Sequence, residues 1–156
     1  MNKQISNFSR RKFVGFGLAS ALAPSVVRGK SPNGKLNMGI IGSGGRGGAN
    51  LNGVKAENIH TLCDINRKTL EAVQKRFKGA KTTTDWREVV SNPDIDAVVI
   101  STADHHHAPA AIAAMRAGKH VYCEKPLAHT VQEARWMQEE YAKAKGKIAT
   151  QMGTQI

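Results

Sequence analysis

The chain has 156 residues, of which 40% are hydrophobic, and this is enough for the core of one ordinary domain. Its formal net charge of +11 could suit a nucleic-acid binder, but residues 1–30 hold six basic residues and no acidic one. In the rest of the chain basic and acidic residues are mixed, and no basic block is interleaved with aromatic residues, so we expect no nucleic-acid partner.

The first thirty residues resemble an export signal. Arg10 and Arg11 form a twin arginine, and an apolar stretch at 13–23 follows them. This stretch has the length of a signal-peptide core and is too short to span a bilayer. The pattern resembles twin-arginine signals, which direct folded proteins across a bacterial membrane. We therefore expect 1–30 to be a signal peptide with its linker, a periplasmic or other extracytoplasmic location, and no stable membrane insertion. A chance basic, amphipathic start is the alternative.

From residue 35 onward, apolar runs alternate with segments of helical periodicity. Strands are expected at 36–41, 59–64, 80–84, 96–102, 119–124 and 147–152. Helices are expected at 46–54, 66–77, 85–91, 108–118 and 130–146. In the last helix Thr130 and Glu133 have the spacing of a capping box. Its apolar stripe is expected at Val131, Ala134, Met137 and Tyr141.

This alternation predicts the fold class. Strands that alternate with helices at such spacing pair in parallel through right-handed crossovers. We expect an α/β fold with a doubly wound parallel sheet, the Rossmann fold, in strand order 3-2-1-4-5-6 over residues 35–156. Cys63 and Cys123 each end an apolar run, which is typical of buried strand residues. Two cysteines can form neither a disulfide framework nor a four-ligand zinc site.

The stretch GSGGRG (42–47), the glycine loop, follows the first expected strand and opens the first expected helix. Gly42 would allow the tight turn, Gly44 would let the backbone approach a pyrophosphate, and Gly47 would let helix and strand pack closely. Amides at the helix N-terminus would then face the phosphates. The frame alone is weak, because a glycine-rich chain shows it by chance, and a flexible linker is the alternative. Its place between a strand and a helix favours a dinucleotide site.

Asp64 ends the second expected strand, 22 residues after Gly42. At such a position a carboxylate accepts hydrogen bonds from the adenosine ribose. A carboxylate there also repels a 2′-phosphate, so we expect NAD as the cofactor in preference to NADP. Arg67, three residues further on, could moderate this preference.

Four motifs carry a resemblance to a known family. They are GIIGSGGRG (39–47), LCDIN (62–66), DAVVISTADHHHAPAAIAAMRAGKHVYCEKPLA (96–128) and QMGTQ (151–155). Through them the chain resembles the N-terminal half of the Gfo/Idh/MocA family, which is named for glucose–fructose oxidoreductase, inositol dehydrogenase and rhizopine catabolism. The twin-arginine leader resembles the exported branch of that family.

The resemblance implies roles for individual residues. Lys125, in the tripeptide Glu-Lys-Pro, would lie beside the nicotinamide and hydrogen-bond the reacting substrate hydroxyl, where a lysine cation stabilises a developing alkoxide. Ala103 stands where the family usually has proline, which puts the rigidity of that loop in doubt. The residues assigned to cofactor binding are Gly42, Ser43, Gly44, Gly45, Arg46, Gly47, Asp64, Thr102, His105, His107, Glu124, Lys125 and Gln151.

The run Asp104-His105-His106-His107 could suggest a metal site. Adjacent residues on a turn do not easily converge on one ion, and no remote ligand is evident. We therefore expect no metal.

The activity that the resemblance implies is that of an NAD(P)-dependent oxidoreductase acting on CH–OH groups. It would transfer hydride between a sugar or cyclitol hydroxyl and nicotinamide. Family members carry a second, substrate-binding domain, and this chain stops at Ile156, where that domain should begin. We therefore expect the nucleotide-binding half of a longer protein, inactive alone and homo-oligomeric when full length. The alternatives are an NAD-dependent glycosidase of the same fold and a non-catalytic dinucleotide-binding module.

Overall fold

The computed structural model describes residues 34–144 and 146–154. The expected signal segment at 1–30 lies outside these residues. Among the helices that the structure describes, none is long and apolar enough to cross a membrane.

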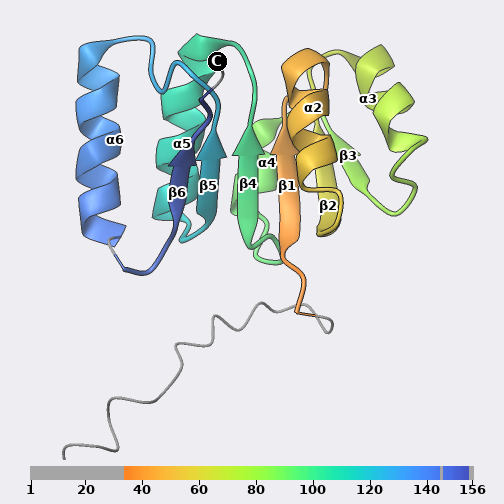
Figure 1. Ribbon diagram of the computed structural model, residues 1–156, viewed down its shortest axis with the longest axis horizontal. Helices are drawn as coiled ribbons and strands as arrows, with labels where there is room; N and C mark the ends of the chain where they lie inside the picture. Colours follow the sequence, from red (N-terminus) through yellow and green to blue (C-terminus); the bar gives the residue numbers. More distant parts are fainter. Residues whose placement is uncertain (1–33, 145, 155–156) are drawn as a thin grey trace, which may run out of the picture.

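Six parallel strands form a single sheet in the order β3-β2-β1-β4-β5-β6, as the sequence predicts (Figure 1). The strands are β1 (Asn37–Ile41), β2 (Asn58–Cys63), β3 (Lys81–Thr83), β4 (Ala97–Ile100), β5 (His120–Cys123) and β6 (Thr150–Met152). The helices are α2 (Gly45–Gly53), α3 (Arg67–Gln74), α4 (Trp86–Ser91), α5 (His107–Arg116) and α6 (Val131–Ala144), with a short 3₁₀ turn, η1 (Asp104–His106), before α5.

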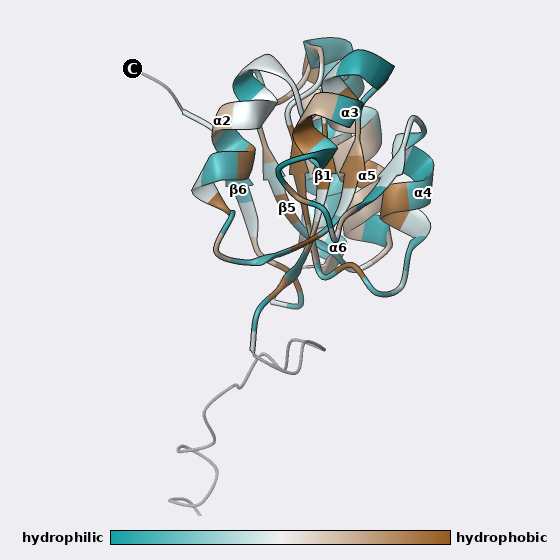
Figure 2. Cartoon of the chain, turned by 90° about the vertical axis from the view of Figure 1, so that its right-hand side faces the viewer, coloured by the Kyte–Doolittle hydropathy of each residue, from teal (hydrophilic) through white to brown (hydrophobic). Residues whose placement is uncertain are grey.

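The helices cover both faces of the sheet. Helices α2 and α3 pack on one face, and α4, α5 and α6 pack on the other (Figure 1). Strands β1 and β4 are buried between the two layers, so their residues are apolar without alternation. Figure 2 shows the hydrophobic segments in the central strands and on the inward sides of the helices. Cys63 and Cys123 are buried in this core, as expected.

Polar side chains begin several helices. Asn66 accepts hydrogen bonds from the backbone N–H groups of Lys68 and Thr69 at the start of α3. Asp85 accepts the N–H of Arg87 at the start of α4. At the start of α6 the predicted capping box is present, since Thr130 Oγ1 accepts the Glu133 N–H at 3.2 Å and Glu133 Oε2 accepts the Thr130 N–H at 2.9 Å. Each cap satisfies N–H groups that have no partner within the helix.

The predicted end of α3 and the predicted apolar face of α6 differ from the structure. Helix α3 ends at Gln74 and not at Phe77, because the N–H groups of Arg76 and Phe77 form i→i+3 turns in place of helical hydrogen bonds. The predicted apolar stripe of α6 is wrong at its ends: Val131 is 72% exposed and Tyr141 is 38% exposed. The helix lies at the end of its layer, where it contacts α5 on one side and solvent on the other. Met137 and Glu140 are its buried residues.

Candidate functional site

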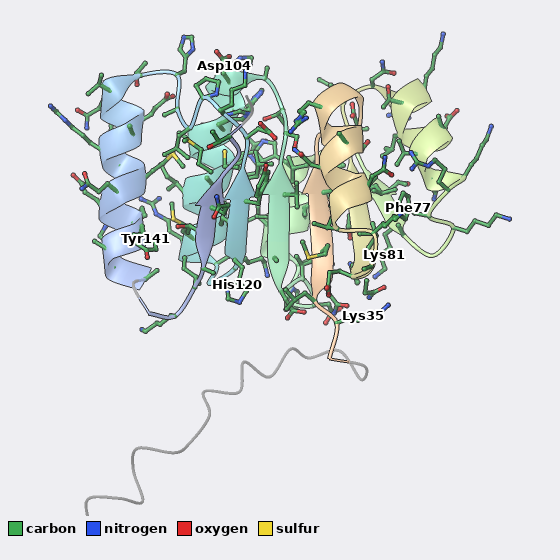
Figure 3. The ribbon with its side chains drawn as sticks, in the orientation of Figure 1. Lys35, Phe77, Lys81, Asp104, His120 and Tyr141 are labelled. Carbon is green, nitrogen blue, oxygen red and sulfur yellow. The ribbon has the colours of Figure 1, made fainter. Side chains whose placement is uncertain are left out.

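The carboxyl ends of all six parallel strands lie along one edge of the sheet, and the predicted site residues follow these strand ends. Figure 3 shows Asp104 at this edge, whereas Lys35, Lys81 and His120 lie at the opposite edge. The topology therefore gathers residues from distant parts of the sequence.

The glycine loop requires glycine for steric reasons. Gly42 has a φ of +85°, and a Cβ there would lie 2.6 Å from the Ser101 carbonyl oxygen. A Cβ on Gly47 would overlap the carbonyl oxygen of Gly42. Larger residues would therefore separate the loop from β4 and from the first turn of α2. No side chain caps α2, so its first backbone N–H groups have the arrangement that binds anions at helix N-termini.

Asp64, which follows β2, holds the glycine loop in place. Its Oδ2 accepts the backbone N–H of Ser43 at 2.9 Å, the Ser43 hydroxyl at 3.2 Å and the N–H of Gly44 at 3.1 Å. Its Oδ1 accepts the N–H of Asn66 at 2.9 Å. The carboxylate therefore joins the β1–α2 loop to the β2–α3 loop, and the side chain of Ser43 is buried beneath it.

A cavity of about 670 Å³, the Asp64 cavity, opens beside this loop. Gly42, Gly44, Asp64, Thr102 and His105 of the predicted site line it. Sequence reasoning missed Trp86 and Arg87 in its wall, where the Arg87 guanidinium lies 4.7 Å from the centre of the Trp86 ring. This cavity has the size that an adenosine group requires, and the glycine loop has the backbone hydrogen-bond donors that a pyrophosphate requires.

A smaller cavity of about 220 Å³, the Lys125 cavity, lies further along the same edge. It is lined by Arg46, Ser101, Thr102, Glu124 and Lys125. Ser101 and Thr102 line both cavities, so the two cavities adjoin, and together they are called the track from Asp64 to Lys125. Lys125 is exposed, and its peptide bond to Pro126 is cis.

Glu124 is buried, with 4% of its surface exposed, and it bonds inward. Its Oε1 accepts hydrogen bonds from Asn50 Nδ2 at 2.9 Å and from Arg46 Nε at 3.2 Å. It also accepts the Tyr122 hydroxyl at 3.2 Å, while Oε2 accepts the backbone N–H of Lys125 at 3.2 Å. Desolvation alone would raise the pKa of Glu124, but these hydrogen bonds outweigh it and lower the pKa to about 2. The carboxylate is therefore ionised and held by the protein.

The histidines of the predicted site differ in position. His105 is exposed on η1 and lines the Asp64 cavity. His107 is 1% exposed, and its ring nitrogens lie 2.6 Å from the Pro126 carbonyl oxygen and 3.0 Å from that of Thr102. The structure thus places His107 beneath the track, where it joins the loop after β4 to the loop after β5. Its predicted contact with the cofactor stays a prediction.

Gln151 does not line the Lys125 cavity. It is exposed on the edge strand β6 and lines a mostly apolar cavity of about 250 Å³ formed with α5, α6 and β5. Its predicted contact with the nicotinamide stays a prediction. Asn50 and Tyr122 were missed, although Asn50 lies four residues after Arg46 and therefore on the same face of α2.

No group of three or more His, Cys, Asp or Glu in residues 34–144 and 146–154 is placed to hold a metal ion. Asp104 instead bonds within its own turn and to His129. The His105 N–H and the His129 ring lower the pKa of this carboxyl.

Known proteins show similarity over the same region. Levoglucosan dehydrogenase of Pseudarthrobacter phenanthrenivorans is 37% identical over 113 residues, which are 65% of this chain and 29% of that protein. Alpha-N-acetylgalactosaminidase of Shewanella oneidensis is 35% identical over 134 residues, 74% of this chain and 29% of that protein. The crystal structure of myo-inositol dehydrogenase from Lactobacillus casei in complex with NAD(H) and myo-inositol superposes with a TM-score of 0.70 at 27% identity, over 76% of this chain and 36% of that one. The chain thus spans about a third of the length of these relatives.

The family model of the Gfo/Idh/MocA oxidoreductases, described by its NAD-binding Rossmann fold, matches residues 36–152. This match covers most of the chain, including the glycine loop, Asp64 and Lys125. The chain belongs to the Gfo/Idh/MocA oxidoreductase family and forms its NAD-binding Rossmann domain.

Proposed function

We propose that the protein carrying this chain is an NAD-dependent oxidoreductase that moves hydride between a carbinol carbon of a sugar or cyclitol and the nicotinamide. The observation that carries the proposal is the track from Asp64 to Lys125, two adjoining cavities that share Ser101 and Thr102. The track gives one elongated ligand contact with a ribose-binding carboxylate at one end and a cation at the other. The names of the relatives, a levoglucosan dehydrogenase and a myo-inositol dehydrogenase, support the substrate class.

The chain's own residues have distinct tasks in this proposal. Asp64 accepts the adenosine ribose hydroxyls, and the amides at the start of α2 contact the pyrophosphate. When bound, NAD supplies the nicotinamide carbon that accepts or returns the hydride. The Lys125 ammonium would lie beside the reacting hydroxyl and stabilise the negative charge that develops on its oxygen, as the proton passes to a general base of the substrate-binding domain and the hydride passes to NAD.

Replacement of Lys125 in the complete protein tests this assignment. With a panel of sugars and cyclitols, we expect Lys125→Ala to lower NADH formation by at least about a hundredfold, while NADH still binds, because the developing charge loses its cation. Lys78→Ala, at an exposed lysine beyond α3, is the matched control and should keep full turnover. Wild-type turnover by Lys125→Ala would contradict the role of Lys125.

A second candidate is supported by the relative named alpha-N-acetylgalactosaminidase. In an NAD-dependent glycosidase of this fold the cofactor would oxidise the sugar transiently, so NAD would be reduced to NADH and regenerated within one turnover. Product analysis separates the two candidates, because a glycosidase cleaves a glycosidic bond and accumulates no NADH. A dehydrogenase accumulates NADH with the bond intact.

We propose, in addition, export by the twin-arginine route. The support is the sequence Arg10-Arg11 followed by the apolar stretch at 13–23. Fractionation of bacterial cells is the test: the wild-type chain should reach the periplasm, and a chain with both arginines changed to lysine should stay in the cytoplasm. Equal export of both chains would overturn the proposal.

A further inference from the structure

The surroundings of Glu124 connect separate parts of the site. Asn50, in the middle of α2, donates one hydrogen bond to Glu124 Oε1 at 2.9 Å and one to Ser101 Oγ at 2.8 Å. A single side-chain amide therefore joins the helix of the glycine loop to the residue after β4 and to the residue after β5. Ser101 is also the residue whose carbonyl oxygen packs against Gly42.

Tyr122 approaches the same carboxylate from β5, and its hydroxyl donates to Glu124 Oε1 at 3.2 Å. Gly153, after β6, closes this side, because a Cβ there would lie 2.7 Å from the Tyr122 hydroxyl and 2.8 Å from the Glu124 Cδ. Its own N–H donates to the Cys123 carbonyl at 2.7 Å. The carboxylate is thus confined by donors and by close packing.

The second carboxylate oxygen of Glu124 bonds to the backbone of Lys125. Glu124 Oε2 accepts the Lys125 backbone N–H at 3.2 Å. Both residues follow β5 and line the Lys125 cavity. A shift of Glu124 would therefore move the backbone from which the Lys125 side chain extends. Groups held in a fully bonded polar network keep a fixed geometry, and small displacements of reacting groups reduce catalysis strongly.

We propose that Asn50 and Tyr122 are positioning residues: by holding the Glu124 carboxylate they set Lys125 and the nicotinamide end of the track relative to the glycine loop. This inference rests on the proposed function, which places the nicotinamide beside Lys125. Neither residue needs to touch the cofactor or the substrate for this effect.

The test compares two ligands on the 156-residue chain. NADH occupies the whole track, whereas ADP-ribose lacks the nicotinamide and reports on the adenosine and pyrophosphate end alone. The dissociation constants of both are measured by titration calorimetry for wild type, Tyr122→Phe and Asn50→Ala. Matched controls are Tyr141→Phe, at an exposed tyrosine of α6, and Asn52→Ala, at an exposed asparagine of α2.

We expect the wild-type chain to bind NADH more tightly than ADP-ribose. Tyr122→Phe and Asn50→Ala should each reduce this preference about fivefold and leave ADP-ribose binding within about twofold, because the lost hydrogen bonds act on the Lys125 end. Both control variants should keep the wild-type preference. Tyr122→Phe removes a single hydroxyl, so it serves as the decisive variant if Asn50→Ala fails to fold, as judged by thermal melting.

Two results would overturn the inference while leaving the proposed function intact. One is an equal loss of affinity for both ligands, which would show a general effect on the fold. The other is an unchanged preference for NADH in both variants. If the wild-type chain itself shows no preference for NADH, the nicotinamide is not bound beside Lys125, and the proposed function fails together with the inference.

Discussion

Asp64 closes the glycine loop through Ser43, since its Oδ2 accepts both the backbone N–H and the hydroxyl of that residue, at 2.9 and 3.2 Å. The same carboxylate is the residue expected to accept the ribose hydroxyls. It therefore shapes the phosphate-binding loop and lines the adjoining cavity at the same time.

The first prediction concerns this carboxylate. Asp64→Ala should weaken NADH binding about tenfold, because a charged acceptor of several hydrogen bonds is lost and the loop loses its partner. It should also reduce the preference for NADH over NADPH, because no carboxylate then repels the 2′-phosphate. Titration with both cofactors measures the two effects, and Asp94→Ala, at an exposed aspartate before β4, is the control. Unaltered NADH affinity in Asp64→Ala would show that Asp64 does not bind the ribose.

The second prediction concerns the steric need for glycine in α2. Gly47→Ala should lower the free energy of unfolding by about 1–3 kcal/mol, because the new Cβ overlaps the Gly42 carbonyl oxygen and forces the helix away from the loop. Gly53→Ala lies in open space at the end of the same helix and should be neutral or slightly stabilising. Urea denaturation of the two variants checks the contrast. Equal stabilities would mean that the loop relaxes without cost.

The third prediction concerns the pH dependence of stability. The pKa of Glu124 is lowered in the folded chain from an ordinary 4.5 to about 2, since its hydrogen bonds outweigh desolvation. Its ionised form therefore stabilises the fold above about pH 4.5, and this contribution is lost as the pH falls toward 2. Glu124→Gln should thus lower the melting temperature most at neutral pH, with a shrinking difference from wild type in acid. Glu139→Gln, at an exposed position on α6, should show no such dependence.

The fourth prediction concerns the two thiols. Burial, together with the nearby carboxylates Asp64 and Glu124, raises the pKa of Cys63 and of Cys123 from 9.0 to about 12. At pH 8 the thiolate fraction is then roughly a thousandfold lower than in the unfolded chain, and burial blocks the reagent as well. Reaction with a colorimetric disulfide reagent should therefore be very slow in the native protein. In guanidinium chloride both thiols should react quickly. Fast reaction of one thiol under native conditions would show that its strand end opens.

Local sequence determined much of this protein. Strand and helix periods, with the right-handed crossover rule, predicted the strand order 3-2-1-4-5-6, which is the order observed. The glycine loop and Asp64, each at the end of an expected strand, predicted a dinucleotide-binding domain, which the family match confirms. The Thr130–Glu133 capping box formed as expected. These features depend on contacts within one turn or on neighbouring parallel strands, so the pattern of residues specifies them directly.

Only the tertiary structure decided which side chains are buried and which polar groups bond to each other, because both depend on which elements meet in space. Val131 and Tyr141 have the helical spacing of a buried stripe, yet Val131 is 72% exposed and Tyr141, in the wall of the cavity between α5 and α6, is 38% exposed. Helix α6 packs against α5, and no further helix of the described residues covers it. His107 is buried, and its ring contacts the loops after β4 and β5 at Thr102 and Pro126. Asn50 and Tyr122 are far apart in the sequence and both bond to Glu124, because α2 packs against β1 and β4 and the end of β5 lies next to β4. A polar side chain's partner is set by this packing, and no local pattern encodes it.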